Sequence, residues 1–114
     1  MNSAQLELQA RQTPQGVVAS LTGDASVDHV DQLEQHMRML AEFPPGLLVL
    51  DLSGVTYISS IGLGVLIRFR NIINEKGGKM KLAALGPKIV DAFRTARLDS
   101  VFEVHPTVES ALGA

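Results

Sequence analysis

Two adjacent serines, Ser59 and Ser60, have the placement in this 114-residue chain that best suits chemistry. They follow an apolar run at residues 47–52 and a short turn, and they precede a segment with helical periodicity. A helix leaves its first backbone N–H groups unpaired, and both these donors and the helix dipole favour negative charge. A hydroxyl at this point can cap the helix or carry a phosphate. Position alone favours capping for Ser60, because serine is among the best N-cap residues.

The segments that position these serines alternate between strand-like and helix-like patterns, in the order β-β-α-β-α-β-α-β-α. This order predicts an α/β fold with a mixed, mostly parallel sheet and an antiparallel hairpin at one edge. The length suits a single domain over residues 1–114. The expected strands are residues 6–10, 17–21, 47–52, 79–84 and 101–104. The expected helices are residues 27–42, about 60–76, 87–98 and 106–112, with Ser26 as N-cap of the first.

The apolar residues of the second helix predict which side of it is buried. We expect the core side to consist of Ile61, Val65, Phe69, Ile72 and Ile73, with Leu66 at its margin. Leu63 and Ile67 fall outside this arc, so they either mark a partner surface or are covered by a neighbouring helix.

Two glycines, Gly62 and Gly64, lie in the expected first turn of the second helix. Glycine costs about 1 kcal/mol in a helix interior, so both positions need a reason. One reason is the close approach of another backbone or of a bulky group.

Composition excludes several classes of function. The chain has a net charge of -2 without a cluster of basic residues, so a nucleic-acid surface is not expected. It has no cysteine, and its three histidines, which we expect at the surface, lack the spacing of a metal site. No apolar run is long enough for a membrane span, and the N-terminus is unlike a signal peptide. We therefore expect a cytoplasmic protein without metal or cofactor. We identify no nucleophile–base pair, so no enzyme is expected.

Several short motifs together resemble a known family, the STAS domain of sulfate transporters and bacterial anti-sigma factor antagonists. The central motif is residues 51–55 (Asp-Leu-Ser-Gly-Val) followed by residues 57–66 (Tyr-Ile-Ser-Ser-Ile-Gly-Leu-Gly-Val-Leu). The likeness extends to residues 21–24 (Leu-Thr-Gly-Asp), to residues 81–83 (Lys-Leu-Ala) and to Gly86-Pro87. The order and size of the expected elements agree with this fold over nearly the whole chain.

The resemblance implies a phosphorylation site. In the antagonists the second helix typically starts Asp-Ser-Ser-Gly-Leu-Gly, and the serine after the Asp is phosphorylated. Aligned on Gly62-Leu63-Gly64, that serine is Ser60, and Ser59 replaces the carboxylate. Ser59 is then a second choice as acceptor, although a turn or capping role suits it better. The family's Gly-Glu-Leu-Asp pattern before the first helix is replaced by residues 23–26 (Gly-Asp-Ala-Ser).

The resemblance also implies partners and a mechanism. The unphosphorylated protein would bind an anti-sigma factor that is itself a serine kinase, and so release a sigma factor; phosphorylation would end this binding. A serine phosphatase of the PP2C type would reverse the modification. Two alternatives stay open: a STAS module of a partner-switching pathway with another output, and a nucleotide-binding STAS domain. The expected partner-binding residues are Asp24, Ser26, Ser59, Ser60, Ile61, Gly62, Leu63, Gly64 and Ile67.

Overall fold

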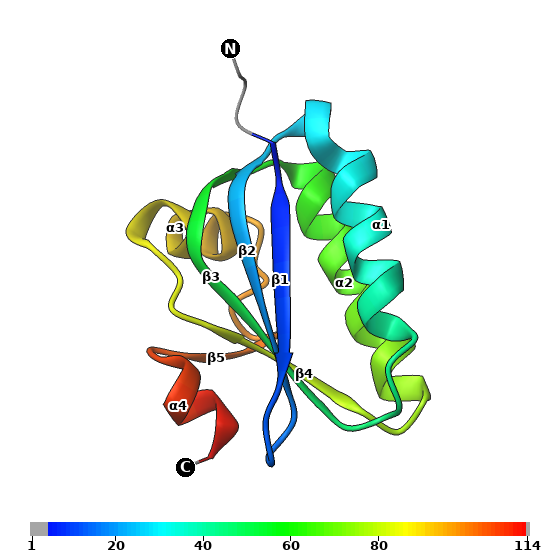
Figure 1. The fold of residues 1–114 in the computed structure, drawn as a ribbon. Helices are drawn as coiled ribbons and strands as arrows, with labels where there is room; N and C mark the ends of the chain where they lie inside the picture. The colour runs from blue at the N-terminus through cyan, green and yellow to red at the C-terminus, as the bar shows by residue number, and fades with distance from the viewer. Residues whose placement is uncertain (1–4, 114) are drawn as a thin grey trace.

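A β-hairpin begins the fold, as the sequence predicts. The strand β1 (Glu7–Gln12) pairs antiparallel with β2 (Val17–Ala25). In the turn between them the Thr13 N–H donates to the Gly16 carbonyl at 2.7 Å. The computed structural model describes residues 5–113, so the outermost residues of the expected 1–114 domain lie outside the described part. Within it, the predicted order of strands and helices is confirmed (Figure 1).

The five strands form one mixed sheet in the order β1-β2-β3-β4-β5. The strands β3 (Leu47–Ile58), β4 (Lys79–Ala83) and β5 (Glu103–His105) continue from β2 with parallel pairing throughout. The predicted end of β3 near residue 52 is wrong. The strand continues because its second half stays paired with the end of β2, across two register shifts. It therefore delivers the chain directly to the serine pair.

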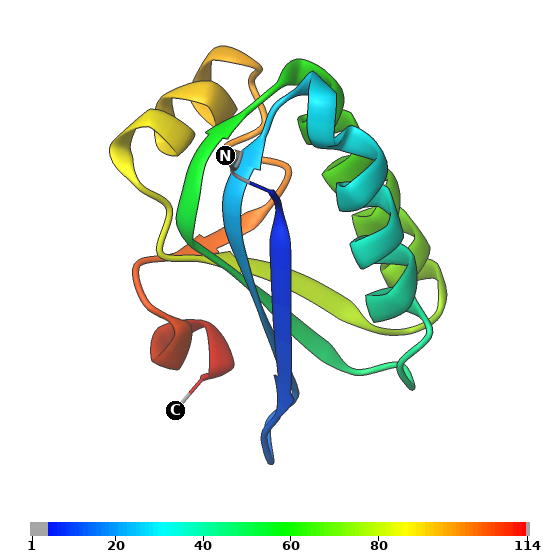
Figure 2. The same cartoon turned by 45° about the horizontal axis from the view of Figure 1, so that its top comes forward.

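Helices cover both sides of the sheet. A short 3-10 turn, η1 (Val27–His29), leads into α1 (Val30–Ala41), which lies beside α2 (Ser60–Glu75) on one face (Figure 1). The helix α3 (Pro87–Thr95) contributes Ile89 and Phe93 to the same core as α1 and α2. The helix α4 (Val108–Leu112) packs on the opposite face, where Ala111 joins a second cluster, and it lies apart from α1 and α2 in both views (Figure 2). None of these helices within residues 5–113 is long and apolar enough to cross a membrane.

Alternation along β3 divides its side chains between the two faces of the sheet. Leu48, Leu50 and Leu52 belong to the main core cluster, to which α1, α2 and α3 all contribute. Val49 belongs to a smaller cluster that includes Ala111 of α4. Because both faces are apolar, β3 is the near-continuous apolar run that its sequence shows.

The start of the first helix differs from expectation. Ser26 makes no side-chain capping bond, and the chain passes through η1 before the α-helix begins. The Ser26 N–H instead donates to Asp24 Oδ1 at 2.9 Å, which closes a local turn. The side chain of Asp24, rather than that of Ser26, therefore stabilises this corner.

The three histidines lie partly within the fold rather than at an open surface, and each is half-buried. His36 Nε2 lies 3.0 Å from the Leu6 carbonyl oxygen, which joins α1 to the start of the hairpin. His105 contacts two side chains described below. Among residues 5–113, no group of three or more potential ligands forms a metal site.

Candidate functional site

Ser59 caps α2, in the role that position alone assigns to Ser60. Its backbone is extended and its Oγ accepts the Gly62 N–H at 3.0 Å. The residue is only 5% exposed. The interpretation of Ser59 as a cap is therefore confirmed. The prediction that Ser60 caps the helix is wrong, because Ser60 is already the first residue of α2.

Ser60 is the first residue of α2 and is exposed. The helix dipole and the unpaired N–H groups of the first turn give this end of α2 a positive potential. The first turn contains no acidic residue that would compensate this potential. A phosphate on Ser60 would thus stand at an end of the helix that tolerates negative charge.

The end of β2 lies directly against the start of α2. Ala25 pairs with Ile58, and its carbonyl oxygen accepts the Ser59 N–H at 3.0 Å. Asp24 and Ser26, which flank Ala25, are half-buried at the same corner. The structure therefore brings together two segments that the sequence separates by more than 30 positions.

The two glycines of the first turn serve different purposes. A Cβ at Gly62 would lie 3.0 Å from Ile58 Cγ1 and 3.2 Å from the Ala25 carbonyl oxygen, so close approach explains this glycine. A Cβ at Gly64 would meet no atom within 4 Å. Gly64 is exposed, so the described part of the chain gives no packing reason for it.

The buried side of α2 differs from the predicted arc. Ile61 is 54% exposed, so its assignment to the core is wrong, and Leu66 is fully buried rather than marginal. Leu63 is 5% exposed and belongs to the core, so it does not form part of a partner surface. Ile67 is half-buried and packs against the same core, so the covered alternative is correct for both. The prediction failed because it was based on apolar side chains alone. Gly62 has no side chain, yet it is buried and so belongs to the core side of α2.

Large apolar side chains are exposed around the serines. Val27 is 59%, Tyr57 55% and Ile61 54% exposed, and all three lie within two residues of the Ala25–Ile58–Ser59 junction. We name these three residues the apolar rim. Sequence reasoning missed Val27 and Tyr57. The sequence could have indicated that Tyr57 is exposed. Successive side chains of a strand face opposite ways, so burial of Ile58 implies that Tyr57 points outward.

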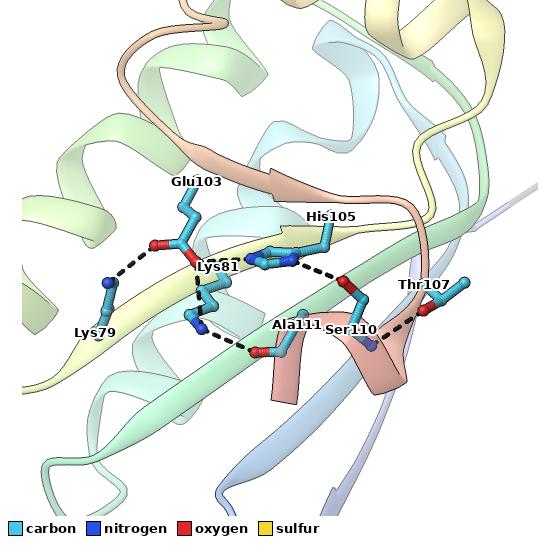
Figure 3. Close-up of polar contacts among 7 residues, drawn as sticks. All are labelled: Lys79, Lys81, Glu103, His105, Thr107, Ser110 and Ala111. Carbon is cyan, nitrogen blue, oxygen red and sulfur yellow. Dashed lines mark hydrogen bonds and ion pairs between the residues drawn. The ribbon is translucent and has the colours of Figure 1, made fainter. Parts of the chain in front are cut away.

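A second polar cluster lies at β5 and α4 (Figure 3). Ser110 Oγ lies 2.9 Å from His105 Nδ1, and His105 Nε2 lies 2.6 Å from Glu103 Oε2. Sequence reasoning identified no such serine–histidine–carboxylate arrangement. The carboxylate also pairs with Lys79 at 2.9 Å and with Lys81 at 3.2 Å.

This sharing of Glu103 favours a structural role for the second cluster. Lys79 first, and then His105 and Lys81, lower the pKa of Glu103 to about 2. Its charge is therefore divided among three partners instead of supporting the imidazole alone. Lys81 also donates to the Ala111 carbonyl at 2.9 Å, so the cluster joins β4, β5 and α4 (Figure 3).

Comparison with known proteins places the whole architecture in one family. The family model described as the STAS domain matches residues 7–111. The protein BtrV of Bordetella bronchiseptica is named as a provisional anti-sigma factor antagonist. It is 29% identical to this chain over 98 residues, covering 86% of this chain and 84% of BtrV. The anti-sigma-B factor antagonist of Bacillus subtilis is 22% identical over 107 residues, covering 94% of this chain and 97% of that protein. The crystal structure of an anti-sigma factor antagonist from Mycobacterium paratuberculosis has a TM-score of 0.87 at 26% identity, covering 98% of this chain and 97% of that one.

Proposed function

Because this chain belongs to the STAS domain family, we propose that it is an anti-sigma factor antagonist regulated by phosphorylation of Ser60. In the unphosphorylated form it binds an anti-sigma factor that is a serine kinase, and the sigma factor is released. The observation that carries this proposal is the exposed Ser60 at the start of α2, beside the apolar rim. The names of its relatives support the same role.

The apolar rim supports a binding function. Exposed apolar side chains gathered at one place are typical of surfaces that bind another protein. Gly64 lies one turn after Ser60 and presents bare backbone on the exposed side of α2. A partner can approach closely there, and such contact would offset the cost of a glycine within a helix. We therefore assign the partner surface to Ser60, Gly64 and the apolar rim, with Asp24 and Ser26 at its edge.

Phosphorylation would act through charge and size. The γ-phosphoryl group of ATP passes to Ser60 Oγ, the bond to ADP breaks, and a base of the kinase takes the hydroxyl proton. The product carries nearly two negative charges. In a closely packed interface this group must be desolvated or excluded, and a penalty of about 3 kcal/mol weakens binding by more than a hundredfold.

The remaining partners follow from this cycle. A serine phosphatase of the PP2C type would restore the binding form, and both reactions would take place in the cytoplasm, where sigma factors act. The protein itself needs no catalytic group or cofactor for this role. The output controlled by the pathway, a sigma factor or another regulator, depends on the identity of the captured kinase.

Capture of the kinase tests the proposal. Tagged wild-type chain and Ser60→Ala are used to capture proteins from an extract of the native cells, and the complexes are incubated with ATP. We expect both forms to bind one serine kinase, and we expect mass spectrometry to place phosphate on Ser60 of the wild-type chain alone.

Two variants complete this test. Ser60→Asp should lose the captured kinase, whereas Ser110→Ala, which changes an exposed serine on α4, should bind and accept phosphate as the wild type does. Phosphate at another residue of the wild-type chain, or undiminished kinase binding by Ser60→Asp, would contradict the proposal.

A further inference from the structure

Ser59 stands out as the buried polar residue of the fold. Among residues 5–113 it is the one polar or charged residue that is buried, with 5% of its surface exposed. Burying a hydroxyl costs free energy unless it is hydrogen-bonded. Ser59 Oγ meets this requirement by accepting the Gly62 N–H at 3.0 Å. The side-chain oxygen therefore stabilises the start of α2.

The backbone of Ser59 ties the same point to β2. Its N–H donates to the Ala25 carbonyl at 3.0 Å, and its carbonyl accepts the Leu63 N–H at 2.9 Å. Gly62, held by the Ser59 hydroxyl, lies so close to the same Ala25 carbonyl that a Cβ would approach it to 3.2 Å. One hydrogen bond of Ser59 thus reaches the end of β2, and two others hold the first turn of α2 on the same residue.

From this arrangement we infer that Ser59 is a positioning residue for phosphorylation of Ser60, and that it is not itself an acceptor. This inference rests on the proposed function. By fixing the first turn of α2, Ser59 directs the next hydroxyl outward and keeps it in register with the apolar rim. A kinase must place the acceptor oxygen close to the phosphoryl group, and a displacement of about 1 Å can cost on the order of a hundredfold in rate. The hydroxyl of Ser59 is unsuited to the reaction, because a phosphate on it would have no room and would break the cap.

The first experiment needs no partner. Hydrogen exchange measured on the free protein should show faster exchange of the Gly62 amide in Ser59→Ala, and near wild-type protection in Ser59→Thr, because threonine can also cap. The matched control is Thr107→Ala, which removes a similar cap, since Thr107 Oγ1 accepts the Ser110 N–H at 3.0 Å. In that variant the Ser110 amide should exchange faster and the Gly62 amide should not. Unchanged exchange of Gly62 in Ser59→Ala would overturn the inference.

The second experiment measures phosphorylation by the captured kinase. Relative to wild type, Ser59→Ala should be phosphorylated at Ser60 on the order of tenfold more slowly or worse. Ser59→Thr and Thr107→Ala should stay near the wild-type rate, even though the melting temperature of Thr107→Ala falls. The Ser60→Ala variant should carry no phosphate on Ser59.

The outcomes separate the inference from the function on which it rests. A wild-type rate in Ser59→Ala, or phosphate on Ser59 in Ser60→Ala, would overturn the positioning role and leave the proposed function intact. Absence of phosphorylation in the wild-type chain would instead contradict the proposed function.

Discussion

The position of each hydroxyl group decides whether Ser59 or Ser60 is available for phosphorylation. Ser59 and Ser60 have the same side chain, yet one hydroxyl is buried against an amide of α2 and the other is exposed. The difference arises from the position at which the helix begins, because the N-cap residue turns its side chain back toward the first turn. The same local geometry makes Gly62 tightly packed and leaves Gly64 open.

These two glycines form a matched pair for a stability test. Gly62→Ala should destabilise the protein by about 1–3 kcal/mol, because the new methyl group meets Ile58 and the Ala25 carbonyl. Gly64→Ala should stabilise it by about 1 kcal/mol, because alanine favours the helix and meets no neighbour. Urea unfolding of both variants measures the two changes. Destabilisation by Gly64→Ala would mean that this glycine has a role within the chain.

At the scale of elements, polar contacts join neighbouring helices and strands. Glu34 of α1 pairs with Arg68 of α2 at 2.7 Å, and Glu103 joins β5 to β4. The second of these clusters also reaches α4 through His105 and Lys81 (Figure 3). A five-residue helix such as α4 has little stability of its own, so these contacts and the burial of Ala111 must hold it.

The Glu103 cluster predicts a pH dependence of stability. Lys79, His105 and Lys81 lower the pKa of Glu103 from 4.5 to about 2 in the folded protein. Because the folded pKa is the lower one, ionised Glu103 stabilises the fold fully above pH 4.5, and this contribution is lost as the pH falls toward 2. Glu103→Gln should therefore lower the melting temperature near neutral pH, and the difference from wild type should shrink on acidification.

Melting curves across that pH range check this prediction. Glu109→Gln, which changes an exposed carboxylate of α4 outside the cluster, serves as the control and should show a smaller difference at neutral pH. A difference between wild type and Glu103→Gln that grew as the pH fell would have the wrong sign.

At the scale of the whole molecule, the proposed switch requires no refolding. Ser60 projects from the end of a helix, and the residues beneath it are already packed and hydrogen-bonded. Added charge therefore changes the surface rather than the core. The Ala25–Ile58–Ser59 junction and the sheet behind it should be the same in both forms of the protein.

Ser60→Asp tests this rigidity. We expect a stability equal to that of the wild type or higher by about 0.3–1 kcal/mol, because a carboxylate at the first turn interacts favourably with the helix dipole. Amide chemical shifts should change only near the substitution. Widespread changes across the sheet, or a clear loss of stability, would show that the charge acts by disturbing the fold.

Much of the architecture could be predicted from the sequence, because periodicity and turn residues mark the elements one by one. The hairpin, the order of elements and the start of α3 at Pro87 are confirmed. The second half of β3 was missed because polar residues interrupt its apolar pattern, and pairing with β2 supplies what local propensity does not. The Glu103–His105–Ser110 cluster was missed because its contacts depend on how β5 and α4 meet, which spacing alone does not determine.

The site was predicted in part for the same reason. The motif located the serine pair, but hydropathy could not reveal that Gly62 buries its backbone or that Ile61 faces outward. Those outcomes depend on the phase of α2, which is the rotation of the helix about its own axis relative to the end of β2. The hydrogen bond from the Ser59 N–H to the Ala25 carbonyl fixes that phase, and it connects residues distant in sequence.

Ser60 and α4 lie near opposite ends of β3, and this determines how the protein can be labelled. Ser60 follows the carboxyl end of β3, whereas α4 packs near the opposite end, on Val18 and Val49. A dye, a biotin group or a fused reporter attached after α4 would therefore point away from Ser60. Immobilised through such a handle, the molecule would present the serine pair to solution, so that binding sensors would record the partner without obstruction by the support.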